Sequence, residues 1–158
     1  MLDLSIRPLQ PDSPWPAQIA AEQFEYWGPL TGHASRAAYE TFLEQAAHSQ
    51  TLPRVLVATS RTTLLGSVNL LASEMTVRPQ LTPWLSQLFV TASRRKSGAG
   101  SALLDAAVSY IAELGYRQLF LFTSGTLPAY YRSRGWRDVD DVDYLGKLRT
   151  VMRFDIDG

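Results

Sequence analysis

The residues best suited to chemistry form a basic loop that contains two glycines. Residues 94–101 read Arg-Arg-Lys-Ser-Gly-Ala-Gly-Ser and separate an apolar run from an amphipathic segment. If that segment is a helix, its first turn presents unpaired backbone N–H groups and the positive end of the helix dipole. Gly98 and Gly100 would let this backbone approach an anion closely, and the three cations would attract it. The loop therefore predicts a phosphate cradle, with a merely solvated turn as the alternative.

Two other phosphate-binding motifs fit this loop poorly. A Walker-type loop places its lysine directly after the last glycine, whereas Lys96 precedes both glycines. The dinucleotide-binding fingerprint needs a third glycine, and Leu103 occupies that place. It also needs an acidic residue about 20 positions on, where this chain has Thr123 and Ser124. A nucleotide-binding domain of either type is therefore disfavoured.

The segments around the loop predict a single mixed α/β sheet. Periodicity predicts helices over 17–27, 35–48, 102–114 and 126–134. Apolar or alternating runs predict strands over 4–8, 54–59, 62–71, 84–91 and 117–123, and two more strands after residue 135. The predicted order is β-α-α-β-β-β-α-β-α-β-β.

Local patterns also predict which side chains face the core. In the second helix we expect Ser35 to cap the N-terminus and Ala38, Phe42 and Ala46 to share the buried face. The run Leu119–Phe122 is apolar on both faces, which is typical of a central strand covered on both sides.

The C-terminal part combines an acidic run with an alternating segment. The aspartates at 138, 140, 141 and 143 predict a solvated connection between strands, because their spacing fits no calcium loop. In residues 147–156 the even-numbered side chains face one way and the odd-numbered side chains the other. We expect this last segment to be able to lie at a sheet edge, where it could support a homodimer.

Composition narrows the classes of protein further. The 158 residues predict one domain over residues 1–158, and 46% hydrophobic residues suffice for a core. Fifteen basic against fifteen acidic side chains argue against nucleic acid or an anionic membrane as partner. The absence of cysteine excludes disulfides and a cysteine nucleophile, and two distant histidines make a metal site improbable. Without a signal-peptide pattern or a long apolar run, we expect a cytoplasmic protein.

The loop and two further motifs resemble the GNAT family of N-acetyltransferases. Residues 95–100 resemble the family's acyl-CoA loop, whose pattern is Gln or Arg, two residues, Gly, one residue, then Gly or Ala. The run Leu88–Val90 resembles the strand that lies beside pantetheine, and residues 131–136 resemble the Tyr-x-x-x-Gly-aromatic helix end. The resemblance covers most of the chain. It departs at Lys96, where the family usually has glycine, and at Ser124, where it often has asparagine.

This resemblance implies an enzyme of the GNAT fold that transfers acetyl from acetyl-CoA directly to a primary amine, without a metal. The pyrophosphate would bind the backbone of the loop, and pantetheine would pair with the strand before it. The implied cofactor-binding residues are Leu88, Phe89, Val90, Arg95, Lys96, Ser97, Gly98, Ala99, Gly100 and Ser101. The alternative is a non-catalytic acyl-CoA-binding or protein-interaction module with the same fold.

The resemblance implies a catalytic tyrosine but indicates no base. Tyr131 matches the position of the general acid that protonates the leaving thiolate, and its neighbour Tyr130 points about 100° away if the segment is helical. Glu74, Glu22 and Glu25 lie in segments that border the acceptor groove in this family, although solvated carboxylates are the more ordinary interpretation. The acceptor, a small-molecule or peptide amine, is not identified by the sequence. Trp15, Tyr26 and Trp27 are candidates to line its pocket, with core packing as the alternative.

Overall fold

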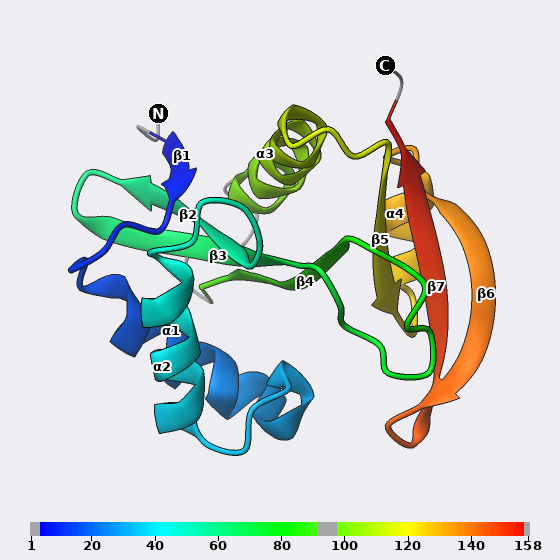
Figure 1. The fold of residues 1–158 in the computed structure, drawn as a ribbon, viewed down its shortest axis with the longest axis horizontal. Helices are drawn as coiled ribbons and strands as arrows, with labels where there is room; N and C mark the ends of the chain where they lie inside the picture. Colours follow the sequence, from blue (N-terminus) through cyan, green and yellow to red (C-terminus); the bar gives the residue numbers. More distant parts are fainter. Residues whose placement is uncertain (1–3, 92–97, 157–158) are drawn as a thin grey trace. The chain divides into compact units, whose positions relative to one another are not determined.

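The computed structural model describes residues 4–91 and 98–156 and confirms the predicted mixed α/β class (Figure 1). The strands are β1 (Leu4–Pro8), β2 (Arg54–Ser60), β3 (Thr63–Leu71), β4 (Trp84–Val90), β5 (Gln118–Thr123), β6 (Arg137–Tyr144) and β7 (Lys147–Asp155). The helices are α1 (Trp15–Trp27), η1 (Gly28–Thr31, a 3₁₀-helix), α2 (Arg36–Ala46), α3 (Ala99–Glu113) and α4 (Leu127–Arg132). The order along the chain is the predicted one, with η1 as the addition.

The described strands are hydrogen-bonded in the order β1-β2-β3-β4-β5-β7-β6. Strand β4 runs parallel to β5, with Trp84 opposite Phe120, whereas β1–β2, β2–β3, β5–β7 and β6–β7 are antiparallel. The chain forms two compact units. The first unit comprises Met1–Leu70 with Gln87–Ala107, and the second unit comprises Leu71–Ser86 with Val108–Gly158.

The core of the first unit lies where α1 and α2 pack against β2 and β3. Helix α1 begins two residues earlier than predicted, because Pro16 is tolerated in a first turn that needs no N–H partner. Gly28, with a φ of 56°, ends the helix as predicted, and its N–H donates to Phe24 O. The buried cluster consists of Leu9, Ile19, Ala20, Tyr39, Leu43, Ala46, Ala47, Val55, Val57 and Leu64.

The predicted N-cap of α2 is confirmed, but of the three side chains predicted along its apolar face only Ala46 is fully buried. Ser35 Oγ accepts the Ala38 N–H at 3.1 Å. The buried face carries Tyr39 and Leu43, whereas Ala38 is exposed and Phe42 is partly buried. Two apolar stripes one residue apart compete on this helix. The stripe that buries Leu43 prevails, and it gives the Tyr39 hydroxyl a buried hydrogen-bond partner.

In the second unit, β5 is the predicted central strand. Its first three apolar side chains, Leu119, Phe120 and Leu121, are at most 2% exposed. Phe120 packs in a core cluster with Met75, Trp84 and Val151. Continuous apolar sequence in β5 therefore reflects cover on both faces.

The expectation that the last segment lies at a sheet edge is wrong. Strand β7 pairs with β5 on one side and with β6 on the other, so β6 is the edge strand. Burial in β7 does not follow the alternation of its side chains, because Val151 and Met152 are both fully buried while Leu148 is 59% exposed. Both faces of the sheet are therefore covered at the middle of β7. The homodimer was expected because this segment could lie at a sheet edge, and that reason no longer holds.

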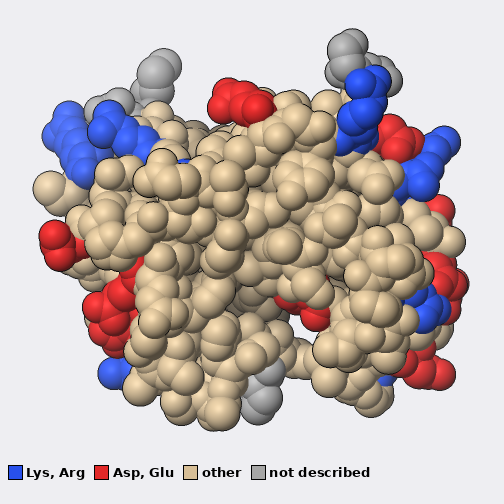
Figure 2. All heavy atoms as spheres, viewed as in Figure 1, with Lys and Arg blue, Asp and Glu red and all other residues tan. Residues whose placement is uncertain are grey.

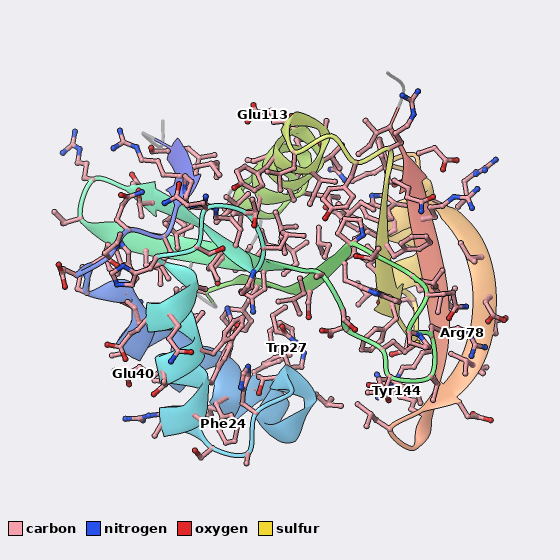
Figure 3. The ribbon with its side chains drawn as sticks, in the orientation of Figure 1. Phe24, Trp27, Glu40, Arg78, Glu113 and Tyr144 are labelled. Atoms are coloured by element: carbon pink, nitrogen blue, oxygen red, sulfur yellow. The ribbon has the colours of Figure 1, made fainter. Side chains whose placement is uncertain are left out.

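The acidic run forms the edge strand β6 itself rather than a connection. On the face shown in Figure 2, acidic side chains gather along the side that β6 occupies in Figure 1. Arg132 pairs with Asp138 at 2.7 Å, and Arg78, labelled in Figure 3, pairs with Asp140 at 2.6 Å. Charged side chains on an edge discourage pairing with a further strand.

Candidate functional site

In the first unit, the start of α3 has the geometry of an anion cradle. Gly98 immediately precedes the helix with a φ of 89°, a conformation that favours glycine. Its carbonyl accepts the Ala102 N–H at 3.1 Å and the Ser101 hydroxyl at 3.3 Å. Gly100 and Ser101 lie in the first helical turn, where backbone N–H groups have no partner within the helix and the dipole is positive. The described half of the predicted cradle, residues 98–101, thus opens a helix.

Gly100 is not required by packing. A Cβ at this position would lie 3.5 Å from Val90 Cγ2, an ordinary contact, and Gly100 does not have a positive φ. A Cβ at Gly98 would meet nothing within 4 Å, so only its backbone conformation calls for glycine. Within the described part of the chain, no contact explains why residue 100 lacks a side chain. A glycine that leaves such room at a helix start permits close approach of a phosphate.

A second glycine position in this unit is fixed by close packing between strands. A Cβ at Gly66 of β3 would overlap the Phe89 carbonyl oxygen and would lie 3.3 Å from Leu103 Cδ1. The Thr91 N–H donates to Leu65 O at 2.8 Å, just beyond this point. Gly66 therefore lets β3, β4 and α3 meet closely at the segment expected to bind pantetheine. Sequence reasoning missed it, although a glycine inside a strand pattern signals such an approach.

Gln87 interrupts β4 with an unusual backbone conformation. Its φ is 47°, in the left-handed region that non-glycine residues rarely adopt. Its side-chain Oε1 accepts from Asn69 Nδ2 at 3.1 Å, and its Nε2 donates to Leu30 O at 3.4 Å. Such a conformation costs of order 1–3 kcal/mol and persists only where surrounding contacts hold it.

These contacts belong to a buried polar network that the sequence analysis did not foresee. Asn69 Nδ2 also donates to the Tyr39 hydroxyl at 3.0 Å, and that hydroxyl donates to Gln23 Oε1. Gln23 Nε2 in turn donates to Ser67 Oγ at 2.6 Å. The four side chains besides Gln87 are each at most 1% exposed. Because buried polar groups must find partners, the network fixes α1, α2 and β3 against the kink in β4.

An aromatic cluster lies at the end of α1. The rings of Tyr26, Trp27 and Phe89 meet edge to face, with centroids 5.4–5.6 Å apart (Trp27 is labelled in Figure 3). Tyr26 is 63% exposed, whereas Phe89 is buried. Tyr26 and Trp27 therefore present an aromatic surface directly beside β4. Trp15, the third aromatic candidate, packs against the core cluster of the first unit instead.

In the second unit, the predicted Tyr-x-x-x-Gly-aromatic motif forms the end of α4. Gly135 has a φ of 95°, and the Trp136 N–H turns back to donate to Tyr131 O at 3.1 Å. The Trp136 ring then packs edge to face on Tyr131, with centroids 6.0 Å apart. A Cβ at Gly135 would be 3.2 Å from the Phe154 ring, so both conformation and space favour glycine here.

The two neighbouring tyrosines of α4 have different surroundings. Tyr131 is 8% exposed, whereas Tyr130 is 38% exposed and lies under the Arg134 guanidinium. Burial, and to a smaller extent Tyr130, raises the pKa of the Tyr131 hydroxyl to about 12. That hydroxyl has no hydrogen bond to any residue that the structure describes. Tyr131 is therefore a protonated donor at neutral pH.

Glu74 is the carboxylate of the second unit with the most altered acidity. The Ser86 hydroxyl, on the first part of β4, donates to Glu74 Oε1 at 2.8 Å. Burial raises the pKa of Glu74 to about 7, and the bond from Ser86 acts in the opposite direction. In the first unit, Glu22 accepts a hydrogen bond from Gln18 and Glu25 is exposed. Burial thus gives Glu74 a pKa close to neutrality.

Part of the predicted cradle lies outside the described residues, namely Arg95, Lys96 and Ser97. Within residues 4–91 and 98–156, no group of three His, Asp or Glu side chains is placed to hold a metal ion. None of the described helices combines the length and hydropathy needed to cross a bilayer.

Comparison with known proteins relates this fold to acetyltransferases. A GNAT-family acetyltransferase from Streptococcus pneumoniae aligns with 98% of this chain and 100% of its own, with 20% identity and a TM-score of 0.71. An aminoglycoside 6'-N-acetyltransferase in complex with coenzyme A aligns over 98% of both chains, with 14% identity and a TM-score of 0.74. YncA from Salmonella typhimurium, solved with its cofactor acetyl-CoA, aligns with 98% of this chain and 94% of its own, with 18% identity and a TM-score of 0.68. No curated protein sequence matches significantly.

At these identities the structural neighbours establish the fold alone. The family assignment comes from the sequence itself, because the model of the acetyltransferase (GNAT) domain matches residues 21–151. That match includes both tyrosines of α4, the start of α3 and all of β4. The chain belongs to the GNAT acetyltransferase family.

Proposed function

We propose that this chain, as one domain over residues 1–158, transfers an acetyl group from acetyl-CoA directly to a primary amine. The observation that carries the proposal is the start of α3, where Gly98 and Gly100 leave the first-turn backbone open to an anion. A Cβ at Gly100 would occupy that space without disturbing the protein. Acetyl-CoA would supply both the pyrophosphate for this cradle and the acetyl group.

The donor would bind along residues of the first unit. Gly98, Gly100 and Ser101 would hold the pyrophosphate through backbone N–H groups, Ala99 would lie in the same turn, and Arg95, Lys96 and Ser97 would complete the loop. Leu88, Phe89 and Val90 would line the pantetheine arm. Support comes from the close packing of β3 on β4 at Gly66, which gives this strand one fixed backbone path.

Glu74 is our candidate for the base that the reaction needs. An alkylammonium with a lysine-like pKa near 10.4 must lose a proton before its nitrogen can attack, which costs roughly 4–5 kcal/mol at neutral pH. A carboxylate with a pKa of about 7 is half ionised there and accepts that proton better than an ordinary glutamate. Ser86, which holds Glu74, lies on the same strand as Phe89 and three residues before it.

Tyr131 is our candidate for the donor to the leaving sulfur. The amine nitrogen would form the C–N bond as the C–S bond breaks, the sulfur would leave with the electron pair, and the nitrogen would release its remaining extra proton to water. With a pKa of about 12, Tyr131 is a weaker acid than a thiol of about 8.5, so complete proton transfer would cost about 5 kcal/mol. Tyr131 would therefore act mainly as a hydrogen-bond donor to the developing thiolate, with water delivering the final proton.

The first test is titration calorimetry of the protein with acetyl-CoA, with NAD and ATP as controls. We expect saturable binding of acetyl-CoA alone, and Gly100→Ala should weaken it without lowering the melting temperature. A panel of amines is then screened by release of free thiol. It includes aminoglycosides, because two of the similar structures are aminoglycoside acetyltransferases. Folded protein that binds neither acetyl-CoA nor CoA would refute the proposal. Binding without turnover of any amine would favour the non-catalytic module.

A further inference from the structure

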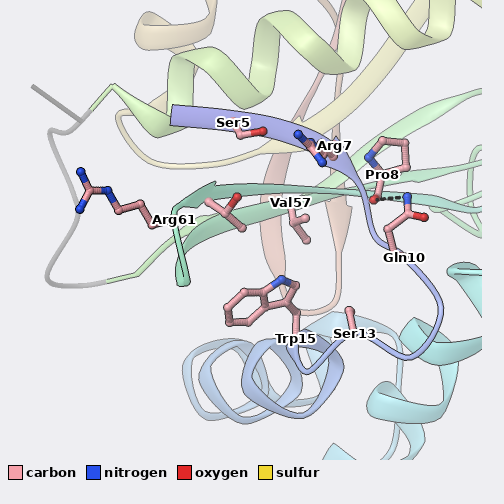
Figure 4. A pocket seen from close by; sticks show the side chains of 9 residues that line it. Ser5, Arg7, Pro8, Gln10, Ser13, Trp15, Val57 and Arg61 are labelled. Atoms are coloured by element: carbon pink, nitrogen blue, oxygen red, sulfur yellow. Dashed lines mark hydrogen bonds between the residues drawn. The ribbon is translucent and has the colours of Figure 1, made fainter. Parts of the chain in front are cut away.

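A cavity of about 360 Å³ opens in the first unit between β1, β2 and the start of α1 (Figure 4). It is lined by Arg7, Arg61, Ser5, Thr59, Ser13 and Trp15, among others. Its volume falls within the range of small-molecule sites. None of its lining residues belongs to the candidate functional site described above, so it is a separate feature of the same unit.

The described lining of this cavity carries positive charge and no negative charge. Arg7 and Arg61 both line it, and within residues 4–91 and 98–156 neither has an ion pair or hydrogen bond. By contrast, four other arginines of the chain form ion pairs with aspartates. Among the residues that the structure describes, no Asp or Glu lines the cavity; Asp12, next to Ser13 in the sequence, is exposed and is not one of its lining residues. Two arginines that line one cavity and have no partner among the described residues favour an anionic ligand.

One buried hydroxyl of the cavity lining also lacks a partner among the described residues. Ser13 Oγ is a buried atom with no hydrogen-bond partner in the described part of the chain. Leaving a buried hydroxyl unsatisfied is unfavourable, and native proteins rarely do so. Helix α1 begins beside it with Pro14 at the N-cap and no side-chain cap, so the positive end of its dipole also lacks a side-chain acceptor. An acceptor oxygen on a ligand would satisfy both the Ser13 hydroxyl and the N-terminus of α1.

One wall of the cavity is apolar. Trp15 packs against the core cluster of the unit while its indole faces the cavity, as Figure 4 shows. Val57 beside it is 5% exposed. A bare inorganic anion would leave this wall uncovered, whereas a flat apolar group would stack on the indole.

We propose that this cavity binds a small carboxylate carried on an aromatic group, with the carboxylate held by Arg7 and Arg61 and the ring against Trp15. The Ser13 hydroxyl donates to the carboxylate. The proposal does not depend on the acetyl-transfer function, since binding here needs neither acetyl-CoA nor an amine.

The test uses benzoate as probe, with benzyl alcohol as its neutral counterpart and inorganic phosphate as an anion without a ring. Binding is followed by ¹H–¹⁵N spectra of the full chain, in which the Trp15 indole N–H signal is assigned with Trp15→Phe. We expect saturable shifts of this signal with benzoate. Arg7→Gln and Arg61→Gln should each raise the Kd for benzoate about tenfold, because each removes charge-assisted hydrogen bonds, which are stronger than neutral ones. The matched control is Arg36→Gln, which removes an exposed arginine of the same unit outside the cavity and should leave the Kd unchanged.

Ser13→Ala separates binding from folding. It should weaken benzoate binding several-fold and yet keep or raise the melting temperature, because it removes an unsatisfied buried hydroxyl. Equal binding of benzyl alcohol, or insensitivity to both arginine variants, would overturn the assignment of an anion. Phosphate binding as tight as benzoate binding would overturn the proposal that the ligand carries an aromatic ring. Absence of any saturable shift in folded protein would overturn the site.

Discussion

The Ser86 hydroxyl donates a 2.8 Å hydrogen bond to Glu74 Oε1 and so ties a carboxylate with a pKa of about 7 to strand β4. Burial disfavours the charged form of Glu74, and the bond from Ser86 favours it. The balance between these two effects leaves the group able to take and release a proton at neutral pH.

The first prediction concerns stability against pH. The pKa of Glu74 is raised from 4.5 to about 7, so the folded protein holds this proton more tightly than the unfolded chain does. The stability contributed by Glu74 is therefore lost as pH rises from about 4.5 to about 7, by up to about 3 kcal/mol. Urea unfolding should show Glu74→Gln equal to the wild type at pH 4 and more stable at pH 8. An unchanged difference between the two pH values would mean that Glu74 is not held in its neutral form.

The second prediction isolates the hydrogen bond itself. Ser86→Ala removes the donor that lowers the pKa of Glu74, so the pKa should rise further above its ordinary range. Carboxyl ¹³C resonances followed through a pH titration measure this directly. Ser133→Ala removes a hydroxyl that donates instead to the Tyr130 carbonyl, and it should leave the Glu74 titration where it is.

The third prediction concerns the two tyrosines of α4. Tyr131→Phe should lower kcat about 10²–10³-fold, the usual contribution of one positioned hydrogen-bond donor to a developing negative charge. Its melting temperature should change little, because the Tyr131 hydroxyl has no hydrogen bond within the described residues. Tyr130→Phe is the matched control and should keep its activity, since Tyr130 lies at the surface under Arg134. Full kcat in Tyr131→Phe across the pH range would exclude the donor role.

The fourth prediction compares two glycines that look alike in sequence. Gly66→Ala forces a Cβ into the Phe89 carbonyl, so β3 and β4 must separate, at a cost of about 1–3 kcal/mol. Gly100→Ala meets only an ordinary contact with Val90 and replaces glycine inside a helix, which should be neutral or stabilising by a few tenths of a kcal/mol. Denaturant titration of both variants checks the contrast. Equal destabilisation would mean that Gly100, too, is fixed by packing.

Local sequence patterns were sufficient to predict the order of the helices and strands and the ends of several helices. Gly28, Ser35 and Gly115 each mark a helix boundary, because capping depends on a residue and its near neighbours. The same holds for the motif at Tyr131, whose spacing is that of a helix end with a returning aromatic.

Features that depend on long-range contacts could not be predicted in this way. The position of β7 between β5 and β6 follows from pairing across the sheet, which alternation in one segment does not specify. The buried face of α2 was decided by Gln23, a residue of another helix. The pKa of Glu74 depends on burial by the folded chain, so the sequence could offer three candidate carboxylates without ranking them.

The network that joins Gln23, Tyr39 and Asn69 to Gln87 has a consequence for local opening. Helix α2 cannot detach without breaking hydrogen bonds that are shared with α1 and β3. Elements linked in this manner exchange their amide hydrogens as one cooperative block rather than by fraying separately. Two short surface helices thereby gain the protection of the strand beneath them, and the kink at Gln87 stays formed for as long as that block is closed.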